Sequence, residues 1–183
     1  LYSSLKYRYI GPDGNRVIAV VGEPGNNNVV YAGAASGGIF KSVDGGTHWQ
    51  PIFDDQDVSS IGSLAIAPSD NNVLWAGTGE TFIRSNISIG KGICKSDDAG
   101  RTWKNMGLGN SGRIGRIIID PRDPNIVFAA VLGHAYGPQQ ERGVYKTIDG
   151  GTTWRKVLFV DENTGASDIA IDANNPRIML AGM

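Results

Sequence analysis

The sequence has 183 residues, of which 40 % are hydrophobic and 19 % charged, and its formal net charge is −1. A chain of this length can bury a core of its own. The balanced charge, without clustered Lys and Arg, argues against nucleic acid as a partner, and no apolar run of about 18 residues is present that would span a membrane.

After a lead-in segment over residues 1–15, short β-rich runs recur along the chain with turn residues between them. First strands are expected at 17–21, 61–65, 114–118 and 166–170, second strands at 29–33, 73–77, 126–130 and 178–182, third strands at 38–42, 92–96 and 143–147, and fourth strands at 48–53, 102–106 and 153–159. No segment of about ten residues has an apolar period of 3.6, so no substantial helix is expected.

An octet of the form Ser/Thr-x-Asp-x-Gly-x-x-Trp separates the third and fourth strands in three repeats, and its tryptophans lie 54 and 51 residues apart. Asp and Ser/Thr side chains bind nearby backbone N–H groups, and Gly accepts a positive φ. This pattern predicts that the aspartates fasten a hairpin rather than catalyse, and that each Trp packs as an anchor. The fastening residues are Ser42, Asp44, Gly46, Trp49, Ser96, Asp98, Gly100, Trp103, Thr147, Asp149, Gly151 and Trp154.

A repeat near 50 residues with four short strands predicts the four-stranded antiparallel blades of an all-β propeller. Complete blades are expected at 16–53, 60–107 and 114–159, and a fourth blade begins at 166–183. Because propellers close with roughly four to eight blades, these three and a half blades are expected to belong to a longer or tandem propeller. The alternative is that two copies pair into one ring.

The octets resemble the Asp-box (BNR) repeats of β-propellers, and the resemblance covers nearly the whole chain. That group includes sialidases, xyloglucanase-type endoglucanases, sortilin-like receptor domains and a photosystem II assembly factor, so it implies the fold more strongly than the activity. In xyloglucanase-type enzymes the first blade resembles Arg-Thr-Asp-x-Gly-Gly-x-Tyr, with a catalytic Asp. The matching stretch here is Gly-Ala-Ala-Ser-Gly-Gly-Ile-Phe, with Ala35 in the acid position.

That departure favours a sortilin-like, non-catalytic binding scaffold that engages a protein, peptide or glycan without metal or cofactor. Such proteins are typically exported, which implies a periplasmic, cell-surface or secreted location. One alternative is a glycoside hydrolase whose two carboxylates lie partly outside this sequence, with Glu80 or Asp168 as local contributors. Another is an accessory or assembly subunit of a larger membrane complex.

The longest insertions, 78–91 and 131–142, both join a second strand to a third strand, on the face opposite the octets, which we call the loop face. Insertions gathered on one face of a repeat protein usually bind there. The loop-face candidates are Glu80, Arg84, Asn86, His134, Tyr136, Gln139, Gln140, Glu141 and Arg142. Packing of these loops on one another is the alternative.

The first strands supply a second set of candidates, because their polar residues point toward the central channel of a propeller. These are Arg113, Arg116 and Asp168. Arg116 and Asp168 hold equivalent positions in consecutive blades, which predicts an ion pair on the channel wall. The single cysteine, Cys94, lies within a third strand and is expected to be a buried thiol.

Overall fold

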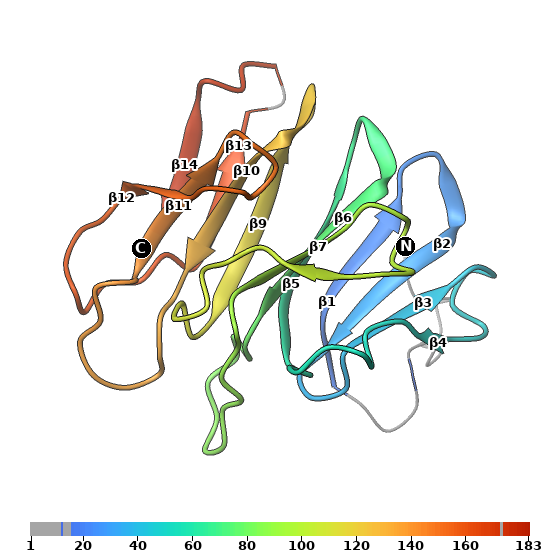
Figure 1. Cartoon of the computed structure of the whole chain (residues 1–183), viewed down its shortest axis with the longest axis horizontal. Helices are drawn as coiled ribbons and strands as arrows, with labels where there is room; N and C mark the ends of the chain where they lie inside the picture. Colours follow the sequence, from blue (N-terminus) through green and yellow to red (C-terminus); the bar gives the residue numbers. More distant parts are fainter. Residues whose placement is uncertain (1–11, 13–15, 173) are drawn as a thin grey trace, which may run out of the picture.

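The computed structural model describes residues 12, 16–172 and 174–183, so the predicted lead-in segment lies, Pro12 excepted, outside the described residues. The described chain forms three four-stranded antiparallel sheets and one two-stranded sheet, and it contains no helix. The sheets stand side by side in an open fan (Figure 1). The predicted fold class, a partial propeller of four-stranded blades, is confirmed.

Within each sheet the strands are hydrogen-bonded in chain order. The first sheet contains β1 (Val17–Glu23), β2 (Asn26–Ala34), β3 (Ile39–Ser42) and β4 (Gln50–Pro51). The second sheet contains β5 (Ile61–Ala67), β6 (Asp70–Thr78), β7 (Ile93–Ser96) and β8 (Lys104–Asn105). The third sheet contains β9 (Ile114–Asp120), β10 (Asp123–Val131), β11 (Gly143–Thr147) and β12 (Arg155–Leu158), and the last contains β13 (Asp168–Ile171) and β14 (Met179–Gly182).

The first strands β1, β5 and β9 and the second strands β2, β6 and β10 are longer than expected, and the fourth strands and β13 are shorter. Each fourth strand begins directly after the tryptophan of its octet, and β4 and β8 have only 2 residues each, whereas β12 has 4. Strand β13 begins two residues later than expected. The reason is that the N–H of Ala166 bonds to the carbonyl of Val131 in the preceding sheet, at 3.0 Å, rather than within its own sheet.

The core lies between consecutive sheets, because alternate side chains of each strand point to opposite faces. Leu74 of β6 packs with residues of the first sheet, and its neighbour Trp75 packs with residues of the third sheet. The innermost strands of the fan are β1, β5, β9 and β13, each of which contacts the next. The chain is therefore held together by packing between blades as well as within them.

Each octet is closed by the same local hydrogen bonds. In the first, the Ser42 hydroxyl donates to Asp44 Oδ1 at 2.8 Å and accepts from the N–H of Gly46 at 2.8 Å. The same oxygen of Asp44 accepts from the N–H of His48 at 2.9 Å. The other two octets repeat this set with Ser96 and Thr147 as the hydroxyl residues.

These hydrogen bonds keep the octet carboxylates ionised. Bonds from the Thr102 side chain and backbone lower the pKa of Asp98 to about 2, and bonds from Thr153 do the same for Asp149. The pKa of Asp44 is lowered as well, chiefly by the backbone N–H of His48 and then by its ring. A general acid needs the opposite shift, so the geometry fits the fastening role expected for these residues.

The octets also join one blade to the next. The Tyr31 hydroxyl of the first sheet donates to the carbonyl of Ala99 in the second octet, at 3.2 Å. In the next pair of sheets, Trp75 packs edge-on against Trp154 with ring centroids 6.0 Å apart. A Cβ on Gly151 would lie 2.6 Å from the Trp75 ring. Each of these octets therefore rests on the second-strand aromatic residue of the blade before it.

Candidate functional site

The octets and the long loops lie at opposite ends of the strands. The N–H of Gly45 bonds to the carbonyl of Asn28 at 2.9 Å, which places the first octet beside the β1–β2 turn. The β6–β7 and β10–β11 loops leave from the other end, and both lie at the lower edge of Figure 1. They form the loop face, where the sequence placed most of the candidate residues.

Glu80 is fully buried beneath the β6–β7 loop. Its carboxylate accepts from Arg84 Nε at 2.6 Å and from Arg16, and the N–H of Ser88 completes the set at 3.3 Å. Burial alone would raise the pKa of Glu80, but these hydrogen bonds lower it overall. Glu80 is thus an ionised, buried carboxylate that holds the loop together, against the expectation that it contacts a ligand or contributes a catalytic acid. The Arg84 guanidinium is largely engaged in hydrogen bonds with it.

Two buried arginines organise the β10–β11 loop. Arg142, 9 % exposed, donates to the carbonyls of Leu132 and Gly137 at 2.7 and 3.0 Å. Arg113, 4 % exposed, donates to the carbonyl of Gly133 at 2.8 Å, and both arginines reach the carbonyl of His134. Burial, and then the charge of Arg142, lower the pKa of Arg113. These guanidinium groups shape the loop from inside, which corrects their assignment as ligand contacts.

The remaining loop candidates are accessible. Asn86, Tyr136 and Gln140 are exposed, and His134 is half-buried with its backbone N–H donating to Gln139 at 2.6 Å. Three exposed apolar side chains of the β6–β7 loop were not predicted: Phe82, Ile83 and Ile89, which are 60 %, 79 % and 54 % exposed. Their place within an otherwise polar insertion was the available signal. The accessible loop face therefore combines amide, aromatic and aliphatic groups.

The ion pair predicted on the channel wall is confirmed. Arg116 Nε lies 3.6 Å from Asp168 Oδ1, and the two side chains are 58 % and 72 % exposed. Both line a groove of about 470 Å³ whose other walls are mostly aliphatic side chains of β1, β5, β9 and β13. Among the described first strands, Asp168 is the only carboxylate at the loop-face end, because Glu23 and Asp120 close the opposite ends of β1 and β9.

The described residues contain neither a cluster of metal ligands nor a thiol with a lowered pKa. No group of three His, Cys, Asp or Glu side chains is close enough there to hold a metal ion. In the acidic link between β4 and β5, Asp57 pairs with Lys91 at 2.6 Å. Cys94 is buried in β7 as expected, and burial raises the pKa of its thiol to about 11. Within the described ranges no helix is long and apolar enough to cross a membrane.

No family model matches the chain. Among curated relatives, a xyloglucanase of Paenibacillus sp is 26 % identical over 185 aligned positions, covering 93 % of this chain and 17 % of the relative. A xyloglucanase of Hypocrea jecorina is 26 % identical over 162 positions, covering 81 % of this chain and 18 % of the relative. The chain therefore spans less than a fifth of the length of these relatives.

Solved structures with the same fold come from several proteins. An ancestral GH74 enzyme matches 90 % of this chain with a TM-score of 0.68 and 23 % identity, covering 22 % of that chain. The GH74 enzyme of Niastella koreensis gives a TM-score of 0.68 at 22 % identity, with 87 % and 25 % covered. YCF48 bound to the D1 peptide gives 0.63 at 14 % identity, with 93 % and 51 % covered. At these identities the likeness establishes a β-propeller fold.

Proposed function

We propose that this chain is a section of the propeller of a glycoside hydrolase that acts on xyloglucan. The observation that carries the proposal is the similarity to two xyloglucanases along 81 % and 93 % of the chain. It favours the hydrolase alternative over the sortilin-like binding scaffold. No comparable observation favours an assembly subunit, since the likeness to YCF48 bears on the fold alone. A polysaccharide substrate also fits the exported location that the resemblance to sortilin-like proteins implies.

Within the chain, Asp168 is our candidate for one of the two carboxylates that glycoside hydrolysis requires. It is exposed, it stands on the wall of the groove beside the Arg116 guanidinium, and its Oδ1 accepts a hydrogen bond from the N–H of Ile169 at 2.8 Å. A carboxylate in this position can activate water or stabilise the positive charge that develops on the sugar ring. Its partner carboxylate belongs to the part of the enzyme beyond these blades.

The alanine in the acid position of the first sheet does not oppose this proposal. Ala35 counts against hydrolysis only if the first sheet of this chain corresponds to the first blade of a xyloglucanase. A chain that covers 17 % of its relative need not correspond to that first blade. The proposal therefore needs no acid at position 35, and it assigns no catalytic role to the buried Glu80.

The test is hydrolysis of xyloglucan by the whole protein and by its Asp168→Asn variant. Removing a catalytic carboxylate is expected to lower kcat by at least about 100-fold. The matched control is Asp57→Asn, since Asp57 is also an exposed carboxylate paired with a basic residue, and its kcat should stay within about twofold. If the wild-type protein did not hydrolyse xyloglucan, the proposal would be overturned. If Asp168→Asn kept full activity, the assignment of Asp168 would be overturned.

A further inference from the structure

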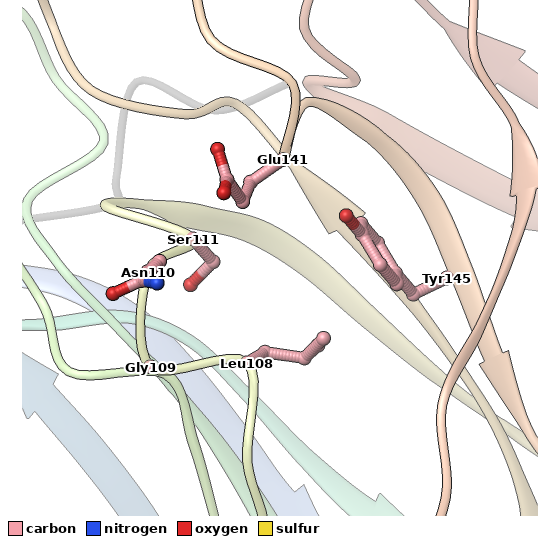
Figure 2. A pocket seen from close by; sticks show the side chains of 6 residues that line it. All are labelled: Leu108, Gly109, Asn110, Ser111, Glu141 and Tyr145. Carbon is pink, nitrogen blue, oxygen red and sulfur yellow. The ribbon is translucent and has the colours of Figure 1, made fainter.

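A second cavity lies apart from the groove that contains Asp168. It has a volume of about 200 Å³ and is lined by Leu108, Gly109, Asn110, Ser111, Glu141 and Tyr145. The first four belong to the connection between β8 and β9; on the other side, Glu141 precedes β11 and Tyr145 lies within it (Figure 2). Gln139 Nε2 donates to the carbonyl of Asn110 at 2.6 Å, which ties the two walls together.

The first wall contains an unsatisfied polar group. Ser111 is only 2 % exposed, and its hydroxyl has no hydrogen-bond partner among the described residues. Its backbone groups are engaged, because its N–H bonds to Leu108 and its carbonyl accepts from Arg113. A buried hydroxyl without a partner destabilises the folded state by about 1–3 kcal/mol. A ligand that forms a hydrogen bond with Ser111 Oγ removes this cost, and the gain adds to the binding free energy.

The backbone of the same wall adopts an uncommon conformation. Leu108 has φ +55°, in the left-handed region that residues other than glycine rarely occupy. Its side chain packs against the core between the second and third sheets, which holds the residue in place. Strained backbone maintained by its surroundings concentrates at binding sites. This turn directs Asn110 and Ser111 to the cavity.

The opposite wall supplies an aromatic ring and a carboxylate. The Tyr145 side chain extends toward Glu141 and Ser111 in Figure 2. Burial, and then the charge of Glu141, raise the pKa of Tyr145, so its phenol keeps its proton and can donate a hydrogen bond. Glu141 supplies acceptors, and Asn110 supplies both kinds of group. No Lys or Arg lines the cavity, which disfavours an anionic ligand.

We propose that this cavity binds one neutral sugar ring of pentose or hexose size. Hydroxyl groups of a sugar match the carboxylate, amide and hydroxyl groups of the walls. The ring can lie beside Tyr145, whose own ring packs on the core and has Lys156 Nζ 5.6 Å from its centroid. The volume equals that of about six or seven water molecules in the liquid, which suits a single ring. The choice of a sugar among neutral polyols rests on the proposed function. The ring is either a free monosaccharide or one unit of a larger glycan.

Hydrogen–deuterium exchange of the whole protein can test this proposal, with methyl β-xyloside and methyl β-glucoside as probes. A ligand present at its Kd slows exchange through local opening about twofold. We expect this protection over residues 107–113 in the wild type and its loss in Ser111→Ala. The matched control is Ser60→Ala, because the Ser60 hydroxyl is also buried without a partner but does not line the cavity; it should keep the protection.

A second variant examines the facing wall. Tyr145→Phe, which removes one neutral hydrogen bond, should raise the Kd about threefold to tenfold. Tyr31→Phe, which removes the phenol hydroxyl that bonds to Ala99 in the octet of the second sheet and does not line the cavity, should leave the Kd unchanged. Tighter binding of a xyloglucan oligosaccharide than of either methyl glycoside would identify a unit of a larger glycan, and equal binding would identify a free monosaccharide.

Two outcomes would overturn the proposal: no protection over residues 107–113 with either methyl glycoside, or the same protection in Ser111→Ala as in Ser60→Ala. Protection by the acyclic polyol xylitol equal to that by the methyl glycosides would also overturn the assignment of a sugar ring. Because exchange reports binding and not hydrolysis, the result is separate from the xyloglucan assay. Asp168→Asn should retain the protection even where it abolishes activity.

Discussion

The two ends of the blades are stabilised in different ways. At one end, each octet is closed by hydrogen bonds between residues at most four positions apart, and the set is the same in all three blades. At the loop face, Glu80 meets Arg16 from 64 positions away, and Arg113 reaches the carbonyl of Gly133 from 20 positions away. Local bonding preserves the repeat, whereas long-range bonding lets each loop differ from its sister loops.

The largest expected effect concerns the contact between an octet and the blade before it. Gly151 has φ +93°, and a Cβ there would meet the Trp75 ring at 2.6 Å, so Gly151→Ala combines backbone strain with a clash and should cost about 3 kcal/mol of unfolding free energy. Gly45 has φ +71° with open space around it, and Gly45→Ala should cost only about 1 kcal/mol. Urea denaturation measures both, and equal losses would mean that the octet does not rest on Trp75.

An intermediate effect is expected from the buried carboxylate of the loop face. Glu80→Gln removes the charge that binds Arg16 and Arg84, and should cost about 2 kcal/mol at neutral pH. Because the folded-state pKa of Glu80 is lowered, its contribution is complete above the unfolded pKa of about 4.3 and is lost as the pH falls through the folded-state value. The difference between variant and wild type should therefore shrink in acid.

The control for this charge is Glu162→Gln. Glu162 is exposed in the connection between β12 and β13, and its carboxylate accepts a hydrogen bond from Gln140 Nε2 at 3.3 Å. Its replacement should change the unfolding free energy by no more than about 0.5 kcal/mol at any pH. If both glutamates behaved alike, the loop face would not depend on buried charge, and its contrast with the octets would disappear.

The smallest expected effect is a gain in stability within the octets. Ala99 has φ +58° at the position where the sister octets have Gly45 and Gly150. Ala99→Gly relieves the left-handed strain but increases the entropy of the unfolded chain, so we expect a net gain of about 0.5 kcal/mol. Thermal unfolding measures it. The Ala99 methyl group packs on the core between the first and second sheets. A loss of stability would indicate that this packing stabilises the folded state by more than the left-handed strain destabilises it.

Sequence alone was sufficient for the fold because the signals are local and repeated. The turn residues of the octets fix where strands end, and the apolar runs fix where they lie. The Arg116–Asp168 pair was predictable for the same reason, since equivalent positions in consecutive repeats lie side by side in adjacent blades. The short fourth strands were not, because all three begin directly after the tryptophan of an octet, yet β4 and β8 end after 2 residues and β12 after 4.

The loop face was predicted less well. Glu80, Arg113 and Arg142 look like surface residues, since they are charged and lie in or beside insertions. Whether such a side chain is buried depends on partners distant in sequence, and in Arg142 on backbone carbonyls that any residue type would provide. The cavity beside Ser111 was likewise invisible, because it forms between a connection and a strand whose approach no local pattern specifies.

The second and third octets each rest on an aromatic residue of the sheet before them, which has a consequence for exchanging parts of this protein. A single sheet is not a self-contained module, because the turn that covers Tyr31 belongs to the next sheet, at Ala99, and Trp103 then stacks edge-on against Phe53 of the first. A chimera joined at the connection between two sheets would pair an aromatic residue with a foreign octet. Recombination that preserves stability must transfer the aromatic strand together with the octet that follows it.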